Sequence, residues 1–354
     1  MSLKMYKVLV LATSRHTHGG ISSVVMAHES SKEWKKTGCK WIATHRSGSK
    51  FTKFLYLLSG LSKYIFYLTS CDIVHIHIGE APSARRKSIF MRLAKLSGKK
   101  TIVHFHAFDT ASTIEGSYKD VYRKLFEDAD HVIVLSDMWK ENVCKVFDIR
   151  DKIHVLYNPC PALPKDSHYT AKQKFILSAG VISPRKGYHD LIRAFAKIAH
   201  KYPDWKIVFA GSGEIGKGKE IAKQLGIEAQ VEFSGWVSGE KKHSLFSSAS
   251  IFCLPSYAEG FPMAVLDAWA YGLPVVATPV GGLPDIVHDE DDVLLFIPGD
   301  TTRLSEQLER LITDDKLRVR IETSSQKFAE NQFNIESIGK RLGKIYSDLL
   351  HQRT

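Results

Sequence analysis

The chain has 354 residues, which exceeds one ordinary domain and predicts two. Hydrophobic residues make up 44% and charged residues 25% of it, a balance that is typical of a soluble globular protein and excludes a largely disordered chain. The five cysteines are odd in number and lack metal-ligand spacing, which argues for a reducing compartment and against a disulfide framework. The N-terminus shows no basic start followed by an apolar run, so we expect no secretion signal and predict a cytoplasmic protein.

The net charge of +11 is concentrated in the first half of the chain, where residues 81–108 contain seven Lys and Arg residues and no acid. An apolar stretch precedes them at residues 54–68, but Lys63 interrupts it, and it is shorter than the roughly 20 residues of a membrane-spanning helix. Two interpretations stay open. The apolar stretch and the basic residues 85–100 lie on an anionic surface at the inner face of a membrane, or the basic residues form a solvated face beside an ordinary core helix. No nucleic-acid-binding module accompanies the charge, so nucleic acid is not a predicted partner.

Short β-branched runs alternate with longer amphipathic stretches along the whole chain. The runs that predict strands are residues 6–12, 73–78, 101–106, 131–135, 174–179, 206–210, 231–233, 251–254, 274–277 and 293–296. Helical patterns occur at residues 187–201, 302–311 and 335–350. This alternation predicts an α/β fold with doubly wound parallel sheets, in which ligands bind at the carboxyl ends of the strands.

A linker interrupts the alternation at residues 158–164, where the sequence reads Asn-Pro-Cys-Pro-Ala-Leu-Pro. Such a density of proline cannot continue a helix or a central strand. A second series of strands and helices begins after it. We therefore predict a first Rossmann-like domain at residues 1–160 and a second at residues 161–334, facing each other across a cleft.

Two turns that follow predicted strands are suited to phosphate binding. Gly19 and Gly20 precede a helical pattern, so the backbone there can approach a ligand closely and the helix N-terminus favours an anion. Arg185 and Lys186 follow the strand at residues 174–179, where Arg can bind phosphate with two N–H groups and Lys acts as a point charge. Each signal alone is weak, because any tight turn uses glycine and an Arg-Lys pair on a loop is usually solvated.

The strand at residues 101–106 contains two histidines, His104 and His106, which share one face. His106 is nearer to the carboxyl end of the strand and therefore to the predicted cleft. His104, like His75 and His77, is predicted to be a packed or hydrogen-bonded strand residue.

The most informative stretch begins at Glu259 and reads Glu-Gly-Phe-Pro-Met-Ala-Val-Leu-Asp-Ala-Trp-Ala-Tyr-Gly-Leu-Pro-Val-Val-Ala-Thr-Pro-Val-Gly-Gly. Pro262 suits the first position of a helix, whose free N–H groups can bind phosphate or sugar oxygens. Glu259 precedes that turn and Asp267 lies inside the helix, so the two carboxylates can hold different hydroxyl groups of one extended ligand. As alternatives, the two acids could act as general acid and base, or Asp267 could be a solvated helix residue.

This stretch resembles the signature of the GT-B glycosyltransferases of family 4, in which two glutamates separated by seven residues precede a Gly-Leu-Pro-Val-Val turn. The likeness continues through residues 281–287, Gly-Gly-Leu-Pro-Asp-Ile-Val, and spans most of the chain. Four further features of the family precede this stretch in the expected order: a Gly-Gly loop, a His-containing strand end, an Asn-Pro linker and an Arg-Lys-Gly turn. The resemblance implies that the first domain binds the acceptor and the second binds the nucleotide sugar. It also implies that the C-terminal helix, within residues 335–354, packs back on the first domain.

The resemblance assigns the donor site. Glu259 would bind the hydroxyl groups of the donor sugar, and Asp267 would bind the ribose of the nucleotide. The residues that would line the sugar and the phosphates are Gly260, Phe261, Pro262 and Met263, together with Gly19 and Gly20. Asp267 stands where the family has its second glutamate and is one methylene shorter, so we expect its ribose contact to be weaker or shifted.

Four further residues receive roles from the resemblance. Arg185 and Lys186 would stabilise the charge on the leaving nucleoside diphosphate. The family commonly has an arginine where this chain has Val181, so Arg185 is expected to take over part of that role. His106 would contact the donor sugar near the reacting carbon, and Asp109 would either orient the acceptor hydroxyl or cap the next segment. We expect no cofactor and no metal, because the two cations and the helix N-termini can supply the positive charge.

The resemblance implies a retaining, metal-independent hexosyltransferase that uses a nucleotide-diphosphate sugar. No side chain is placed as a covalent nucleophile, so we expect front-face attack. The basic first domain suggests a glycan or lipid-linked saccharide acceptor in bacterial surface polysaccharide synthesis. Two alternatives stay open, a nucleotide-sugar epimerase on the same fold and a non-catalytic nucleotide-sugar-binding relative. The second is motivated by Val181 and Asp267.

Overall fold

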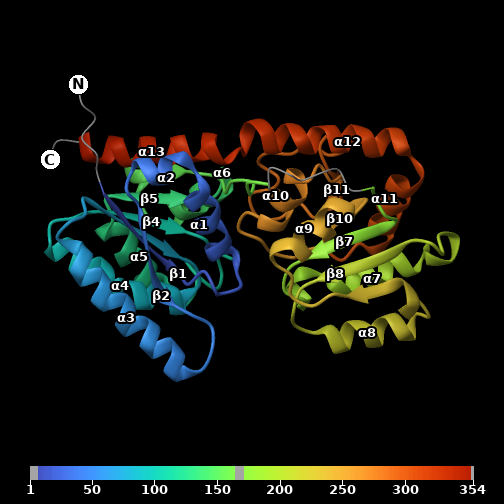
Figure 1. The fold of residues 1–354 in the computed structure, drawn as a ribbon, viewed down its shortest axis with the longest axis horizontal. Coiled ribbons are helices and arrows are strands. Elements are labelled where there is room, and N and C mark those ends of the chain that lie inside the picture. Colours follow the sequence, from blue (N-terminus) through green and yellow to red (C-terminus); the bar gives the residue numbers. More distant parts are fainter. Residues whose placement is uncertain (1–6, 164–170, 352–354) are drawn as a thin grey trace. The chain divides into compact units, whose positions relative to one another are not determined.

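The computed structural model describes residues 7–163 and 171–351 and divides into two compact units (Figure 1). Unit 1 consists of Met1–Pro159 and Phe333–Thr354, and unit 2 consists of Cys160–Gln332. The ends of three predicted segments lie outside the described residues, namely residues 6, 164 and 352–354. Each unit contains a six-stranded parallel sheet with helices, which confirms the predicted α/β class with two doubly wound domains.

The sheet of unit 1 has the strand order β2-β1-β3-β4-β5-β6, with every neighbouring pair parallel. Its strands are β1 Val8–Thr13, β2 Lys40–His45, β3 Ile73–Ile78, β4 Lys100–Phe105, β5 His131–Val134 and β6 Ile153–Val155. Its helices are α1 Gly20–Ser30, α2 Lys32–Lys36, α3 Lys50–Leu68, α4 Ala81–Leu96, α5 Lys119–Asp128, α6 Asp137–Val146 and α13 Ile335–His351. The strand order reverses between β1 and β3, and ligands of such sheets bind beyond the carboxyl ends of the strands at that point.

Different helices cover the two faces of this sheet, because successive side chains of a strand point to opposite faces. On one face Leu9 and Leu11 pack with side chains of α3, α4, α5 and α6. On the other face Val8 and Val10 pack with side chains of α1 and α13. The last helix of the chain is therefore part of unit 1.

The sheet of unit 2 has the strand order β12-β11-β10-β7-β8-β9, and its paired strands are all parallel. Its strands are β7 Phe175–Ala179, β8 Lys206–Ala210, β9 Val231–Phe233, β10 Ile251–Leu254, β11 Val275–Ala277 and β12 Leu294–Leu295. Its α-helices are α7 Tyr188–Ala196, α8 Ile215–Gln224, α9 Gly239–Ser248, α10 Met263–Ala270, α11 Thr301–Thr313 and α12 Asp315–Lys327. Here the order reverses between β7 and β10, so the loops after these two strands are where a ligand is expected.

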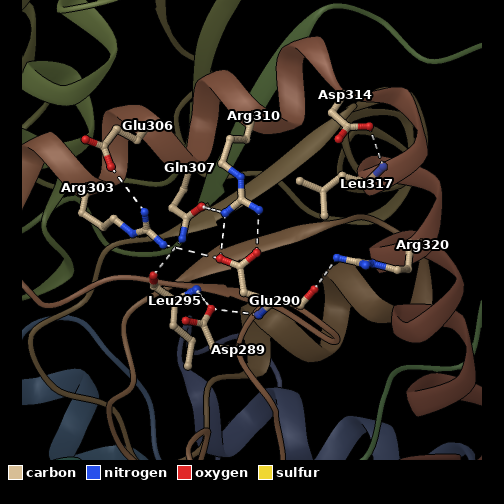
Figure 2. A network of polar contacts seen from close by, with 10 residues as sticks. All are labelled: Asp289, Glu290, Leu295, Arg303, Glu306, Gln307, Arg310, Asp314, Leu317 and Arg320. Carbon is tan, nitrogen blue, oxygen red and sulfur yellow. Dashed lines mark hydrogen bonds and ion pairs between the residues drawn. The ribbon is translucent and has the colours of Figure 1, made fainter.

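Ion pairs fix the connection from β11 to β12. Figure 2 shows the carboxylate of Glu290 between Arg303 and Arg310, and Arg310 donates to Glu290 Oε1 at 2.7 Å. Arg320 of α12 donates to the Glu290 carbonyl oxygen at 2.8 Å. Glu290 has a φ of 70°, which residues with a side chain adopt rarely. These contacts tie a strained turn to α11 and α12.

One residue of the predicted basic surface is buried. Lys87 of α4 is fully buried, and its Nζ donates to the carbonyl oxygen of His77 on β3. Burial, with a smaller effect of Arg86, lowers the pKa of Lys87 to about 7. The prediction of a basic surface formed by residues 85–100 is therefore wrong at this position, because the ammonium group faces the protein interior.

Among the described residues, none of the helices has the length and hydropathy of a membrane span.

Candidate active site

The acid motif and the Arg-Lys turn meet where the strand order of unit 2 reverses. Glu259 follows β10, and Lys186 lies in a short 3-10 helix, Pro184–Lys186, that follows β7. Lys186 Nζ is 2.5 Å from Glu259 Oε1, and the two side chains are only 18% and 8% exposed. Arg185 Nη1 donates to the carbonyl oxygen of Ala258 at 2.6 Å and lies 3.9 Å from Glu259 Oε2. The fold thus places two cations against one buried carboxylate.

A close approach of two loops produces this geometry. The Tyr257 N–H donates to the Arg185 carbonyl oxygen at 2.7 Å. Gly187 has a φ of +66°, and a Cβ at this position would lie 1.9 Å from the carbonyl oxygen of Pro255. No other residue fits there without moving one of the two loops.

We expect Gly187→Ala to lower the stability of unit 2 by at least about 2 kcal/mol, since it adds a left-handed backbone cost to a steric overlap. The matched change Gly19→Ala should cost less than about 1 kcal/mol, the difference between glycine and alanine at a helix cap. A Cβ at Gly19 would meet no atom within 4 Å. Melting temperatures of the two variants check this expectation, and equal melting temperatures would contradict it.

The first turn of α10 lies next to this carboxylate in the sequence. The helix begins at Met263 with Pro262 at its cap, one residue later than predicted. A hydrogen bond from the loop after β11 fixes the residues before this turn, because the Gly282 N–H donates to the Gly260 carbonyl oxygen at 2.8 Å. The Phe261 side chain is buried. The first N–H groups of a helix have no partner within it, so they are available to ligand oxygens.

Asp267 lies farther along α10 and has a cationic partner that the sequence did not reveal. Lys242 of α9 donates to Asp267 Oδ1 at 2.7 Å. Burial raises the pKa of Asp267, and the nearby Lys242 opposes that shift. Lys242 belongs to none of the motifs, so only the structure identifies it as a candidate site residue.

In unit 1, the predicted phosphate turn follows β1. Gly19 caps α1, and a Cβ at Gly19 or Gly20 would meet no atom within 4 Å. Ser22 holds the turn, because its hydroxyl lies 2.9 Å from the Gly19 carbonyl oxygen and also within hydrogen-bond distance of the Thr17 carbonyl oxygen. Neither glycine is required by packing, which leaves this backbone open to close approach.

His106 lies one residue beyond the end of β4 and is half-buried. Its Nε2 is 2.8 Å from Nδ1 of His77 on the neighbouring strand β3. Burial, His75, Lys87 and His28 hold the pKa of His106 well below its usual range. The ring is therefore neutral at neutral pH, which suits a hydrogen bond to a sugar hydroxyl better than stabilisation of an anion.

The carboxylate of Asp109 accepts hydrogen bonds from the backbone of its own loop. Its Oδ2 accepts from the Ser112 N–H at 2.9 Å, and its Oδ1 accepts from the Ala111 N–H at 3.3 Å. Of its two proposed roles, these contacts favour capping of the next segment. Its acceptor role stays a prediction.

A stack of histidines lies behind His106. The rings of His75 and His104 are 5.4 Å apart with an interplanar angle of 7°, and His75 and His77 are 4.4 Å apart at 26°. Nitrogens of these three rings lie within 4.8 Å of one another, a grouping that could hold a metal ion. A metal bound to imidazole lies near the plane of the ring, and stacked, nearly parallel rings do not share one such point. We therefore assign no metal to this stack.

The sequence matches known families over both halves. Residues 11–161 match the family described as Glycosyltransferase Family 4, and residues 162–328 match the family described as Glycosyl transferases group 1. The second range contains every predicted site residue of unit 2, and the first contains every one of unit 1. Together the two matched ranges run from residue 11 to residue 328 and support a group 1 glycosyltransferase.

Relatives and solved structures agree with this placement. An uncharacterized glycosyltransferase of Methanocaldococcus jannaschii is 30% identical over 231 residues, which cover 61% of this chain and 59% of that protein. The putative colanic acid biosynthesis glycosyltransferase WcaL of Escherichia coli K12 is 24% identical over 306 residues, 83% of this chain and 74% of the relative. The crystal structure of Anabaena HepE in complex with UDP-glucose has a TM-score of 0.78 at 18% identity, covering 97% of this chain and 100% of that one. At this identity the structural likeness shows the fold.

Proposed function

We propose that the chain is a retaining glycosyltransferase that moves a hexose from a nucleoside-diphosphate sugar to a hydroxyl acceptor. The observation that carries the proposal is the buried pair of Lys186 and Glu259, beside Arg185. A carboxylate accepts hydrogen bonds from sugar hydroxyls, and the cations oppose the charge that builds up on the departing diphosphate. The Anabaena structure with UDP-glucose supports a nucleotide sugar as donor.

In the proposed reaction, the acceptor oxygen forms a bond to the anomeric carbon while the bond from that carbon to the diphosphate oxygen breaks. The hydroxyl proton passes to the leaving phosphate oxygen, so the products are a glycoside and a nucleoside diphosphate. Glu259 is held by Lys186, which favours a binding role over nucleophilic attack. Arg185, Lys186 and the first turn of α10 supply the positive charge, so we propose that no metal is required.

For the acceptor we propose a glycan or lipid-linked saccharide of a bacterial surface polysaccharide. Two observations support this class. The E. coli relative is named for colanic acid biosynthesis. The net positive charge of this chain lies in its first half, which favours an acceptor that is anionic or held at an anionic surface.

A thermal-shift screen of nucleoside diphosphates and nucleotide sugars tests the donor proposal. One nucleotide family at about 100 times its Kd should stabilise the protein by about 2.7 kcal/mol, seen as a higher melting temperature. The shift should persist in EDTA and disappear in Glu259→Ala and Lys186→Ala. Absence of any shift in the folded protein would contradict the donor proposal. A shift without turnover of any acceptor would support the non-catalytic nucleotide-sugar-binding relative. Conversion of the donor to an epimer without acceptor would support the epimerase.

A further inference from the structure

Helix α3 of unit 1 exposes an unusual number of apolar side chains. Of its 19 residues only Gly60, Tyr64 and Leu68 are buried. The apolar side chains that stand out of its surface are Phe51, Phe54, Leu55, Leu58, Ile65 and Phe66, and all are at least 45% exposed. The sequence left two interpretations open for residues 54–68, a segment that lies on an anionic membrane surface or an ordinary core helix. In the structure most of the apolar side chains of α3 do not enter the core.

These side chains lie on one side of the helix and form a stripe, in which Ser62 separates Leu58 from Ile65. Counted from Phe51, they occupy positions i, i+3, i+4, i+7, i+14 and i+15. At 3.6 residues per turn, these positions fall within an arc of about 120°. Single exposed apolar residues are common, but a helix-long stripe marks an interaction surface.

The opposite side of α3 is fixed to the rest of unit 1, so the stripe is not the result of a loosely attached helix. The Tyr64 hydroxyl donates to the Phe90 carbonyl oxygen of α4 at 3.0 Å, and the two rings are 5.2 Å apart. A Cβ at Gly60 would lie 2.8 Å from the carbonyl oxygen of Ala43 on β2. Helix and sheet are therefore in close contact, and the stripe points away from them.

The surface around the stripe is basic. Neither α3 nor α4 contains an acidic residue. On α3 the exposed Lys50 and Lys63 lie beyond the two edges of the stripe, whereas the exposed Lys53 lies on the other side of the helix. On α4 an exposed row spaced i, i+4, i+7 and i+11 alternates base and apolar residue, and its members are Arg85, Ile89, Arg92 and Leu96. Figure 1 shows both helices on the same flank of unit 1.

We propose that this α3–α4 surface docks unit 1 on an anionic lipid bilayer, with α3 lying in the headgroup region. An apolar stripe bordered by Lys and Arg, without acids, is complementary to such a surface in both hydrophobicity and charge. A nucleic acid would contact the Lys and Arg side chains of this surface but not the row of Phe, Leu and Ile side chains. The inference goes beyond the proposed function, because docking needs neither donor nor acceptor.

Flotation of the full chain with vesicles tests the proposal. We expect binding to phosphatidylcholine vesicles that contain phosphatidylglycerol, weaker binding in high salt, and little binding to phosphatidylcholine alone. The variant Phe54→Ser/Leu58→Ser should lower the partition coefficient at least about tenfold, since each side chain loses its transfer to the apolar phase. A matched control, Ile297→Ser/Val319→Ser, removes two apolar side chains of unit 2 that are more exposed than Phe54 and Leu58, and it should bind as the wild type does.

Three outcomes would overturn the proposal. The first is wild-type protein that does not float with anionic vesicles. The second is equal loss of binding in the control pair of variants. The third is a dimer in sedimentation velocity that the α3 variant disperses, because the stripe would then contact a second copy. The nucleotide thermal shift of each variant, measured in parallel, separates a loss of docking from a loss of fold or of donor binding.

Discussion

Replacing Glu259 with glutamine is expected to lower kcat/KM about a hundredfold while the protein stays folded. The carboxylate is 8% exposed, so its hydrogen bonds to a ligand would form with little competition from water. A hundredfold loss corresponds to about 2.7 kcal/mol. That lies within the about 1.5–3 kcal/mol that one hydrogen bond to a charged group contributes. The measurement is the initial rate of nucleoside diphosphate release from the donor identified by thermal shift. Wild-type kcat/KM in Glu259→Gln would exclude the proposed role.

A second variant separates function from folding. Lys186→Met leaves a nearly buried carboxylate without its 2.5 Å partner, which costs about 3 kcal/mol of stability when such a pair is broken. The double variant Lys186→Met/Glu259→Gln removes both charges, so part of the stability should return. The activity should not return, because neither the sugar contact nor the cation is restored. If the double variant recovered both properties, the pair would be structural only.

Another ion pair of unit 2 provides the control. Lys201 and Glu309 lie 3.1 Å apart, but their side chains are 51% and 32% exposed. An exposed pair contributes at most about 1 kcal/mol. Glu309→Gln should therefore leave both kcat/KM and the melting temperature close to wild type.

The central strands could be predicted from sequence, whereas two edge strands could not. The predicted ranges of β3 and β8 agree with the structure at both ends, because buried parallel strands are continuous β-branched runs. The strands β2 and β6 were not predicted. Both lie at the edge of their sheet, where β2 alternates partly exposed and buried residues and β6 has only three residues. An edge position alone does not hide a strand, because the short edge strands β9 and β12 were predicted from their apolar residues.

The sequence motifs identified the residues of the candidate site but not their partners. The positions of Lys186 and Glu259 followed from motifs that each stand at the end of a strand, and parallel strands bring such ends to one edge of a sheet. The contact between Lys242 and Asp267 depends on how α9 packs beside α10, and no local pattern encodes it. The burial of Lys87 is different, because Lys87 lies three residues after Ala84 and four before Met91 and so shares the buried face of α4, although its charge alone suggested exposure.

Unit 1 is expected to lose stability steeply below about pH 6.5, the ordinary value for histidine. Burial lowers the pKa of His28 to about 4 and that of His75 to about 3. Burial also holds the pKa values of His77, His104 and His106 well below the usual range. The charged groups that act on these rings are other histidines and Lys87, and all of them disfavour protonation.

The sign follows from these depressed values. Above pH 6.5 the five histidines are neutral in both the folded and the unfolded chain, so their contribution to stability is fully present. As the pH falls through 6.5 the unfolded chain binds protons that the folded chain does not, and stability decreases. Each ring then costs about 1.4 kcal/mol per pH unit, so five cost about 7 kcal/mol at about pH 5.5. That is comparable to the 5–15 kcal/mol that typically separates folded from unfolded protein.

Protection factors from hydrogen exchange between about pH 8 and 5.5 test this expectation unit by unit. Segments in β3, β4, α1 and α13 should lose protection, while β7, β8 and β10 keep it. His104→Leu should reduce the slope of stability against pH by the equivalent of about one proton. The reason is that both ring nitrogens of His104 are buried without a hydrogen-bond partner within the described structure. His16→Gln changes an exposed histidine of unit 1 and should leave the dependence unchanged. An equal loss of protection in both units would mean that the histidine stack does not determine the acid limit. If His104→Leu did not change the slope of stability against pH, the His104 ring would already be protonated in the folded state.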